Sequence, residues 1–227
     1  MKQEVSMSNV SVDTLSAVEK ASSLLIDGEK YPYTFIFAHG AGAGMDHEFM
    51  ESVAKGLSFK GIRVIRFNFP YMIKRAEDGK RRPPDRAPKL LEAYQHVIDE
   101  LSVTNVVIGG KSMGGRMASH LSEYDKVAGV ACLGFPFHPP GKPEKYKGEH
   151  LAEVQKPCLI LQGERDTFGK REEFAEFNLS DSIKVSFIPD GDHSFKPRKS
   201  SGYTEQKNIA LTVELLSTFI KEVLDEK

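Results

Sequence analysis

The fold is indicated most directly by one stretch of the sequence, VTNVVIGGKSMGGRMAS at residues 103–119. Its first part, Val103–Ile108, is apolar and rich in β-branched side chains, as expected for a strand. A glycine-rich turn follows, and the next segment, Arg116–Ser122, is compatible with a helix. A buried strand, a tight turn and a helix in this order predict one βα unit of a parallel sheet.

The turn contains the pattern G-x-S-x-G, formed by Gly110, Ser112 and Gly114. In a strand-to-helix turn of this kind the serine has strained backbone angles, and side chains at the two glycine positions would collide with neighbouring backbone. The turn raises the Ser112 hydroxyl to the carboxyl edge of the sheet, where α/β folds place ligands, and near a helix N-terminus that favours negative charge. We therefore interpret Ser112 as a nucleophile. The alternative is an ordinary serine in a glycine-rich turn.

The rest of the sequence alternates between strand and helix patterns. Further apolar runs are predicted as strands: Tyr33–Ala38, Ile62–Phe69, Val127–Leu133, Cys158–Leu161, Ile183–Ile188 and, with a weaker pattern, Ala21–Ile26. Segments with apolar residues at three- and four-residue intervals are predicted as helices: His47–Leu57, Pro88–Leu101 and Thr204–Leu224. This alternation predicts an α/β fold with a mostly parallel central sheet of about six to seven strands, flanked by helices.

Two segments lack either pattern. Ile73–Pro88 is charged and contains prolines but few apolar residues, so we expect a long loop that is functional or mobile. Phe135–Lys156 is a second irregular segment and is too short for a separate lid domain. Because no domain boundary is evident, residues 1–227 are predicted to form a single domain without a lid.

The composition is that of an ordinary globular chain, with 227 residues of which 40% are hydrophobic and 28% charged. The net charge of −1 argues against the basic surface of a nucleic-acid-binding protein, so no nucleic-acid partner is expected. Cys132 and Cys158 are too few for a disulfide framework and, on separate strands, do not have zinc-site spacing, so no metal is expected. Neither a membrane span nor a signal peptide is evident, which predicts a cytoplasmic protein without membrane association.

A serine hydroxyl becomes a good nucleophile only when a base removes its proton and a carboxylate orients that base. Two later strands run into suitable residues. The strand at 158–161 leads to Asp166, far enough past the strand end to reach inward over the sheet, and the strand at 183–188 leads to His193. We therefore expect His193 to be the base that takes the Ser112 proton and Asp166 to be the carboxylate that orients His193. Three other loop carboxylates remain open as the acid: Glu164, Asp190 and Asp192.

An oxyanion formed by attack of Ser112 requires hydrogen-bond donors aimed at it. One expected donor is the backbone N–H of Met113, the residue after the nucleophile. The other is expected in the small-residue loop after the strand at 33–38, from the N–H of Ala41 or, as second choice, Gly42. This loop lacks the G-K-[ST] ending of a phosphate-binding loop. His39, at its start, is expected to be structural.

Apolar residues at the expected catalytic edge are candidates for the pocket walls, with core packing as an equal alternative: Tyr71, Met72, Phe135 and Phe137. His138 is a further candidate pocket residue. The basic residues of the 73–88 segment would steer an anionic substrate if that loop overhangs the site, although a charge run is more often a solvated face. Lys111 and Arg116 flank the nucleophile, and an exposed helix start explains them as well as anion binding does.

With these motifs together, the chain resembles the α/β-hydrolase superfamily from about Tyr31 to the C-terminus, and is most similar to a dienelactone-hydrolase-like branch of lidless members. Within it, the chain looks like a subfamily with bacterial proteins of unknown substrate, testis-expressed relatives and a scaffold subunit of a histone-acetyltransferase complex. The segments that carry this resemblance are residues 39–50, 67–72, 109–119, 133–151, 161–169 and 191–199. It implies a Ser-Asp-His triad at Ser112, Asp166 and His193, with Ala41 and Met113 as oxyanion donors. Dienelactone hydrolases proper have cysteine in place of Ser112.

Two functions follow as hypotheses. The first is a serine hydrolase that needs no cofactor and cleaves an ester, thioester or small amide of a small-molecule acyl substrate through an acyl-enzyme on Ser112. The open site expected without a lid favours small acyl groups. The second is a hydrolase-fold binding or scaffold protein with little or no turnover, since a fold does not determine a reaction. The sequence predicts neither the natural substrate nor the oligomeric state.

Overall fold

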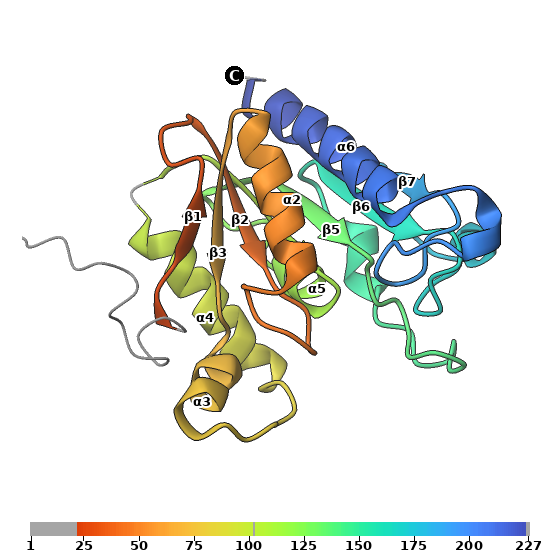
Figure 1. Ribbon diagram of the computed structural model, residues 1–227, viewed down its shortest axis with the longest axis horizontal. Coiled ribbons are helices and arrows are strands. Elements are labelled where there is room, and N and C mark those ends of the chain that lie inside the picture. Colours follow the sequence, from red (N-terminus) through yellow and green to blue (C-terminus); the bar gives the residue numbers. More distant parts are fainter. Residues whose placement is uncertain (1–21, 102, 226–227) are drawn as a thin grey trace, which may run out of the picture.

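The centre of the molecule is a seven-stranded β-sheet in which the strands lie in the order β1-β3-β2-β4-β5-β6-β7 (Figure 1). The computed structural model describes residues 22–101 and 103–225. All neighbouring strands are parallel except β1, which pairs antiparallel with β3 at one edge. The strands are β1 Leu25–Asp27, β2 Tyr33–Ala38, β3 Ile62–Phe67, β4 Val106–Lys111, β5 Val127–Leu133, β6 Cys158–Gly163 and β7 Ile183–Ile188. The predicted α/β class and the mostly parallel sheet are confirmed.

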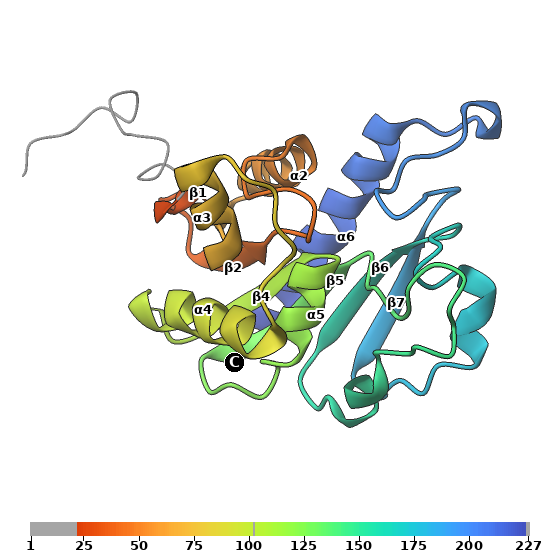
Figure 2. The same ribbon diagram turned by 90° about the horizontal axis from the view of Figure 1, so that it is seen from below.

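Helices cover both faces of the sheet, so it has a hydrophobic core on each side. The α-helices of the described residues are α2 Glu48–Phe59, α3 Pro70–Asp78, α4 Ala87–Glu100, α5 Met113–Ser119 and α6 Glu205–Asp225. One core lies between the sheet and α2 with α6, and the other lies between the sheet and α4 with α5 (Figure 2). Strands that are buried on both faces carry nearly continuous apolar runs, which is why the sequence showed them so clearly. No lid domain covers the described part of the molecule.

The strand order places the ends of β2 and β4 side by side. After β2 the chain turns to one side of the sheet to form β3, and it then returns across β2 to form β4. Ligands of open α/β sheets bind at such a reversal, beyond the carboxyl ends of the strands. The loop after β2 and the turn after β4, which hold Gly40–Gly44 and Ser112, therefore meet at one edge.

Several predicted boundaries are corrected by the structure. The strand predicted at 103–108 is β4 at Val106–Lys111, because the parallel pairing with β5 continues through the glycines to Lys111 opposite Leu133. The Val103 N–H instead donates to the Leu101 carbonyl oxygen, 2.7 Å away, in the turn before the strand. Helix α5 starts at Met113 rather than at Arg116. The first strand is β1 at residues 25–27; Ala21, where that strand was predicted to begin, lies outside the described residues.

The segment 73–88 is not one long loop. Its first part belongs to α3, which has Pro70 at its first turn and ends at Gly79 in the left-handed region with φ +69°. Apolar periodicity did not reveal this helix because its exposed face is charged and Tyr71 is its one buried side chain. A proline that fixes φ at the start and a glycine at the C-cap are the local signals that define it. Residues 79–86 remain irregular.

Both cysteines lie in the core, on the adjacent strands β5 and β6, and neither forms a disulfide. A hydrogen bond with the Cys158 thiol, and then burial, raise the pKa of the Cys132 thiol, which keeps it protonated. No helix in residues 22–101 or 103–225 has both the length and the apolar character needed to span a bilayer.

Candidate active site

Ser112 lies at the sharp turn between β4 and α5, with backbone angles φ +52° and ψ −115°. These angles are unfavourable for a residue with a side chain, so the surrounding structure must hold them. The flanking glycines permit the turn. A Cβ at Gly110 would lie 2.6 Å from the Ala38 carbonyl oxygen, and a Cβ at Gly114 would lie 2.5 Å from the same oxygen. The two glycines of the motif are required because β2 passes this close to the turn.

Three side chains predicted to act together form a chain of two hydrogen bonds. His193 Nε2 lies 2.8 Å from Ser112 Oγ, and His193 Nδ1 lies 2.8 Å from Asp166 Oδ2. Because a carboxylate only accepts, the proton is on Nδ1, and Nε2 is free to accept the Ser112 hydroxyl proton. The three residues follow β4, β6 and β7, as expected from the sequence.

The Asp166 carboxylate is fully buried and its oxygens are held by other groups. The side-chain amide of Gln162 donates to Oδ2 at 3.0 Å, and the Phe168 backbone N–H donates to Oδ1 at 2.9 Å. Gln162 also accepts a hydrogen bond from the Phe135 N–H at 2.8 Å. Sequence reasoning missed Gln162, although a lone polar residue inside a buried apolar strand is a recognisable signal.

The three rival carboxylates have other partners. Glu164 pairs with Arg171 and accepts the Asp190 N–H. The Asp190 carboxylate pairs with two arginines, and Asp192 Oδ1 accepts two backbone N–H groups of its own loop. Among the carboxylates considered, Asp166 is the one that contacts His193.

The pKa of His193 is lower than its ordinary value, which favours the neutral imidazole. Burial lowers its pKa, the Asp166 hydrogen bond opposes this by raising it, and the nearby Lys111 charge lowers it further. The Phe168 ring covers the imidazole, with their centroids 4.2 Å apart. A neutral imidazole with a free Nε2 can act as a general base.

Lys111, next to Ser112 in the chain, is not an exposed residue at a helix start. Its ammonium nitrogen is buried and has no hydrogen-bond partner among the described residues. It lies 5.7 Å and 5.9 Å from the ring centroids of Phe49 and Phe195, which favours a cation over each aromatic face. Burial lowers the pKa of Lys111 to about 8, opposed by the charges of Asp166 and Asp192. No local sequence pattern indicates this burial.

The loop after β2 lies beside Ser112, where the sequence predicted oxyanion donors. The Tyr71 hydroxyl lies 3.1 Å from the carbonyl oxygens of both Gly40 and Ala41, which holds this loop. Ala41 lines both cavities that Ser112 lines, and Gly42 lines one of them. Met113 is the first residue of α5, so its N–H has no intrahelical partner. These residues lie beside Ser112, and their role as oxyanion donors stays a prediction.

His39 at the start of the loop has a structural environment. It is fully buried, its Nε2 accepts the Phe69 N–H at 3.0 Å and its Nδ1 lies 2.7 Å from the Gly40 carbonyl oxygen. Burial lowers its pKa to about 4, so the ring is neutral and joins β2 to the start of α3.

Two cavities meet at Ser112. The first, about 440 Å³, is also lined by His193, and we call it the His193 cavity. The second, about 270 Å³, is lined by His138, and we call it the His138 cavity. His138 was predicted as a pocket residue; its Nε2 lies 3.0 Å from Glu173 Oε1. None of the lysines and arginines of the 73–88 segment lines either cavity.

The other candidate pocket residues pack in the core, the alternative left open by the sequence. Phe135 and Phe137 have no exposed surface, and their rings pack against each other with centroids 4.7 Å apart. Tyr71 is 3% exposed and supports the loop after β2, and Met72 packs against the same core. None of these four residues lines the His193 cavity or the His138 cavity. Phe49 lines the first cavity and Phe168 lines both, and neither residue was predicted from the sequence. Within the described ranges, no three His, Cys, Asp or Glu side chains are grouped to hold a metal ion.

A family model described as "Alpha/beta hydrolase domain" matches residues 32–221 of the chain. Several solved structures share the fold. Est1E from Butyrivibrio proteoclasticus, with bound ferulic acid, is 18% identical with a TM-score of 0.63, covering 90% of this chain and 96% of that one. A dienelactone hydrolase from Anabaena variabilis is 21% identical with a TM-score of 0.65, covering 88% and 89%. A serine hydrolase without a lid from Xanthomonas campestris is 17% identical with a TM-score of 0.60, covering 89% and 87%.

Proposed function

Because the chain belongs to the alpha/beta hydrolase domain family, we propose that it is a serine hydrolase that cleaves an ester, thioester or small amide through an acyl-enzyme on Ser112. The observation that carries this proposal is the pair of 2.8 Å hydrogen bonds that joins Ser112, His193 and Asp166. The strained turn that presents Ser112 to two cavities supports it, because such strain concentrates at functional sites.

In the first half of the reaction, Ser112 Oγ attacks the carbonyl carbon of the substrate while His193 Nε2 takes the hydroxyl proton. Asp166 stabilises the imidazolium that forms and keeps the ring in the correct orientation. The proton then passes from His193 to the leaving oxygen, sulfur or nitrogen, and the bond from this atom to the acyl carbon breaks. Water resolves the acyl-enzyme by the same steps, with His193 again as base.

The negative charge on the former carbonyl oxygen is stabilised by the N–H groups of Met113 and Ala41. Loss of one oxyanion donor typically lowers kcat by about 10²- to 10³-fold. The Tyr71 hydroxyl is a positioning group for this step, since it holds the loop that carries Ala41.

The test is labelling with a fluorophosphonate probe, followed by a panel of p-nitrophenyl esters of graded chain length. Wild type should be labelled and should turn over short esters, whereas Ser112→Ala should do neither. A folded wild-type protein with no labelling and no turnover would contradict the proposal and favour the alternative function, a hydrolase-fold binding protein.

A further inference from the structure

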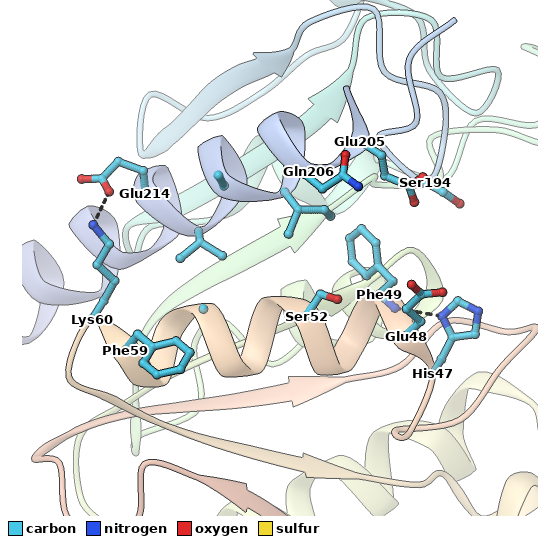
Figure 3. Close-up of a pocket in the computed structure, with 14 residues that line it drawn as sticks. His47, Glu48, Phe49, Ser52, Phe59, Lys60, Ser194, Glu205, Gln206 and Glu214 are labelled. Carbon is cyan, nitrogen blue, oxygen red and sulfur yellow. Dashed lines mark hydrogen bonds and ion pairs between the residues drawn. The ribbon is translucent and has the colours of Figure 1, made fainter. Parts of the chain in front are cut away.

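A groove of about 640 Å³ runs between α2 and α6 and adjoins the His193 cavity. His47, Phe49 and Ser194 line both spaces, so the groove borders the cavity that Ser112 lines. Figure 3 shows Phe49 on α2 directed toward α6, close to the end of the groove where Ser194 lies. The groove then follows the two helices away from this end, toward Phe59 and Lys60.

The floor of the groove is apolar, and the two helices pack closely beneath it. A Cβ at Gly56 would lie 2.6 Å from a methyl group of Val213, so glycine lets α6 approach α2 here. Phe59 is 88% exposed at the far end, an unusual exposure for a large aromatic ring. The carbon surfaces that line the groove come from Phe49, Gly56, Phe59, Ile209, Ala210 and Val213.

The charges on the rim disfavour an anionic ligand. Lys60 is the one lysine or arginine among the residues that line the groove, and its ammonium is paired with Glu214 at 2.5 Å. Glu48 and Glu205 lie at the end near Ser194. A phosphate or carboxylate in the groove would face these carboxylates and would find no unpaired lysine or arginine among the described residues that line it. The groove therefore suits an uncharged, apolar ligand.

The reaction determines which part of the substrate lies on the side of Ser112 that faces His193 and the groove. His193 Nε2 must give its proton to the leaving atom, so the leaving group has to lie beside His193. His193 lines the cavity that borders the groove and does not line the His138 cavity. The leaving group is therefore directed toward the groove, and the smaller His138 cavity remains for the acyl group.

We propose that the α2–α6 groove binds an apolar alkyl chain on the leaving alcohol or thiol of the substrate. This inference rests on the proposed function. During acylation the bond between Ser112 Oγ and the acyl carbon forms, the bond to the leaving oxygen or sulfur breaks, and the proton from Ser112 reaches that atom through His193. The released alcohol or thiol then leaves from the groove. From Phe49 to Phe59 helix α2 rises about 15 Å, so the groove has room for a chain of several methylenes.

Two series of straight-chain esters test the direction of binding. In alkyl acetates from ethyl to octyl the alcohol grows, and in ethyl esters from acetate to octanoate the acid grows. We expect kcat/KM to rise about two- to threefold per methylene in the alcohol series, because the open groove buries each methylene in part. No such rise is expected in the acid series. A rise in the acid series alone, or in neither, would overturn the inference.

Variants that fill the groove test whether the alkyl chain binds there. Ala210→Phe on α6 and Ser52→Phe on α2 put a ring into the groove from opposite sides, and both positions are exposed. Each should lower the octyl-to-ethyl acetate ratio of kcat/KM about tenfold or more, as expected for several methylenes losing their buried surface. Thr218→Phe is the matched control, since Thr218 is exposed on α6 and does not line the groove. An unchanged ratio in both groove variants, with wild-type thermal unfolding, would contradict the inference.

The two proposals fail in different ways. If fluorophosphonate does not label Ser112 and no ester is hydrolysed, the hydrolase function itself is wrong. If Ser112 is labelled and short esters are hydrolysed, but the rates do not depend on the alcohol chain, only the role of the groove is wrong.

Discussion

Two serine–histidine pairs of this molecule have the same hydrogen-bond length and very different surroundings. Ser112 Oγ lies 2.8 Å from His193 Nε2, and Ser119 Oγ lies 2.8 Å from His150 Nε2. The two serines are only seven positions apart, at the start and the end of α5. The comparison shows what a nucleophile needs beyond a nearby imidazole.

The direction of the hydrogen bond differs between the pairs. Ser119 Oγ donates its single proton to the Arg116 carbonyl oxygen at 2.8 Å, so it must accept from His150 Nε2, which then carries the proton. That imidazole cannot take a proton from Ser119. At His193 the Asp166 carboxylate holds the proton on Nδ1, and Nε2 remains an acceptor for Ser112.

The charges around the two imidazoles also differ. Burial lowers the pKa of His150 to about 4, and the neighbouring His120 and Arg116 lower it too. His120 stacks on His150 with ring centroids 3.7 Å apart, and no carboxylate among the described residues pairs with His150. Ser119 itself is 1% exposed, whereas Ser112 lines two cavities. The Ser112 pair differs from its neighbour in three ways: its histidine has a carboxylate partner, that histidine has a free proton acceptor, and its serine lines a cavity.

The largest effect is expected from removing each serine in turn. Ser112→Ala should lower kcat/KM for a p-nitrophenyl ester by roughly 10⁴-fold or more, because the proposed nucleophile is lost. Ser119→Ala should keep wild-type activity, because Ser119 contacts no reacting atom. Steady-state kinetics of both variants checks this. Similar losses in the two variants would remove the distinction between the pairs.

Removing the carboxylate should make the first pair resemble the second. In Asp166→Asn the amide can place its N–H toward His193 Nδ1, which leaves the proton on Nε2 as in His150, and kcat should fall by about 10³- to 10⁴-fold. The kcat of this variant, beside that of His150→Gln as control, measures the effect. A loss in His150→Gln as large as that in Asp166→Asn would contradict the account.

The fold and three members of the site could be predicted because each depends on local patterns. Parallel strands buried on both faces give continuous apolar runs, and their carboxyl ends meet at one edge, which brought Ser112, Asp166 and His193 together in the prediction. Lys111, Gln162 and the Ser119 pair were not predicted. Their surroundings come from segments far apart in the chain, such as Phe49, Phe195 and residue 150, and no local pattern encodes that packing.

The buried ammonium beside the Ser112 pair should reduce stability. Since its folded pKa of about 8 lies below the ordinary 10.5, the charged form is disfavoured in the folded state. A shift of this size corresponds to about 3 kcal/mol in the free energy of unfolding. Lys111→Met should therefore be more stable than wild type below pH 8, by up to about that amount.

The pH dependence of this difference has a definite sign. Between pH 8 and 10.5 the unfolded wild type binds more protons at this lysine than the folded protein does, so wild-type stability rises and the difference shrinks. Urea unfolding of both proteins across this range measures it. A variant less stable than wild type below pH 8 would show that the ammonium contributes stabilising contacts instead.

The smallest expected effect is on the pH profile. The Lys111 charge lowers the pKa of His193, so Lys111→Met should raise that pKa and move the acid limb of kcat/KM to higher pH. Lys111→Arg, which keeps a charge, should move the limb less. An NMR titration of the His193 ring gives the same shift independently of turnover. A limb that stays in place in Lys111→Met would show that this charge does not act on His193.

The most direct test of the account is to locate the acyl group on the enzyme. Wild type is mixed with p-nitrophenyl acetate, quenched in acid and digested with trypsin, which cleaves after Lys111 and Arg116 and so separates the two serines. The peptide 112–116 contains Ser112, and the peptide 117–126 contains Ser119. We expect the mass of one acetyl group on the peptide 112–116. The acetyl group on 117–126 instead, or on neither peptide during turnover, would contradict Ser112 as the nucleophile.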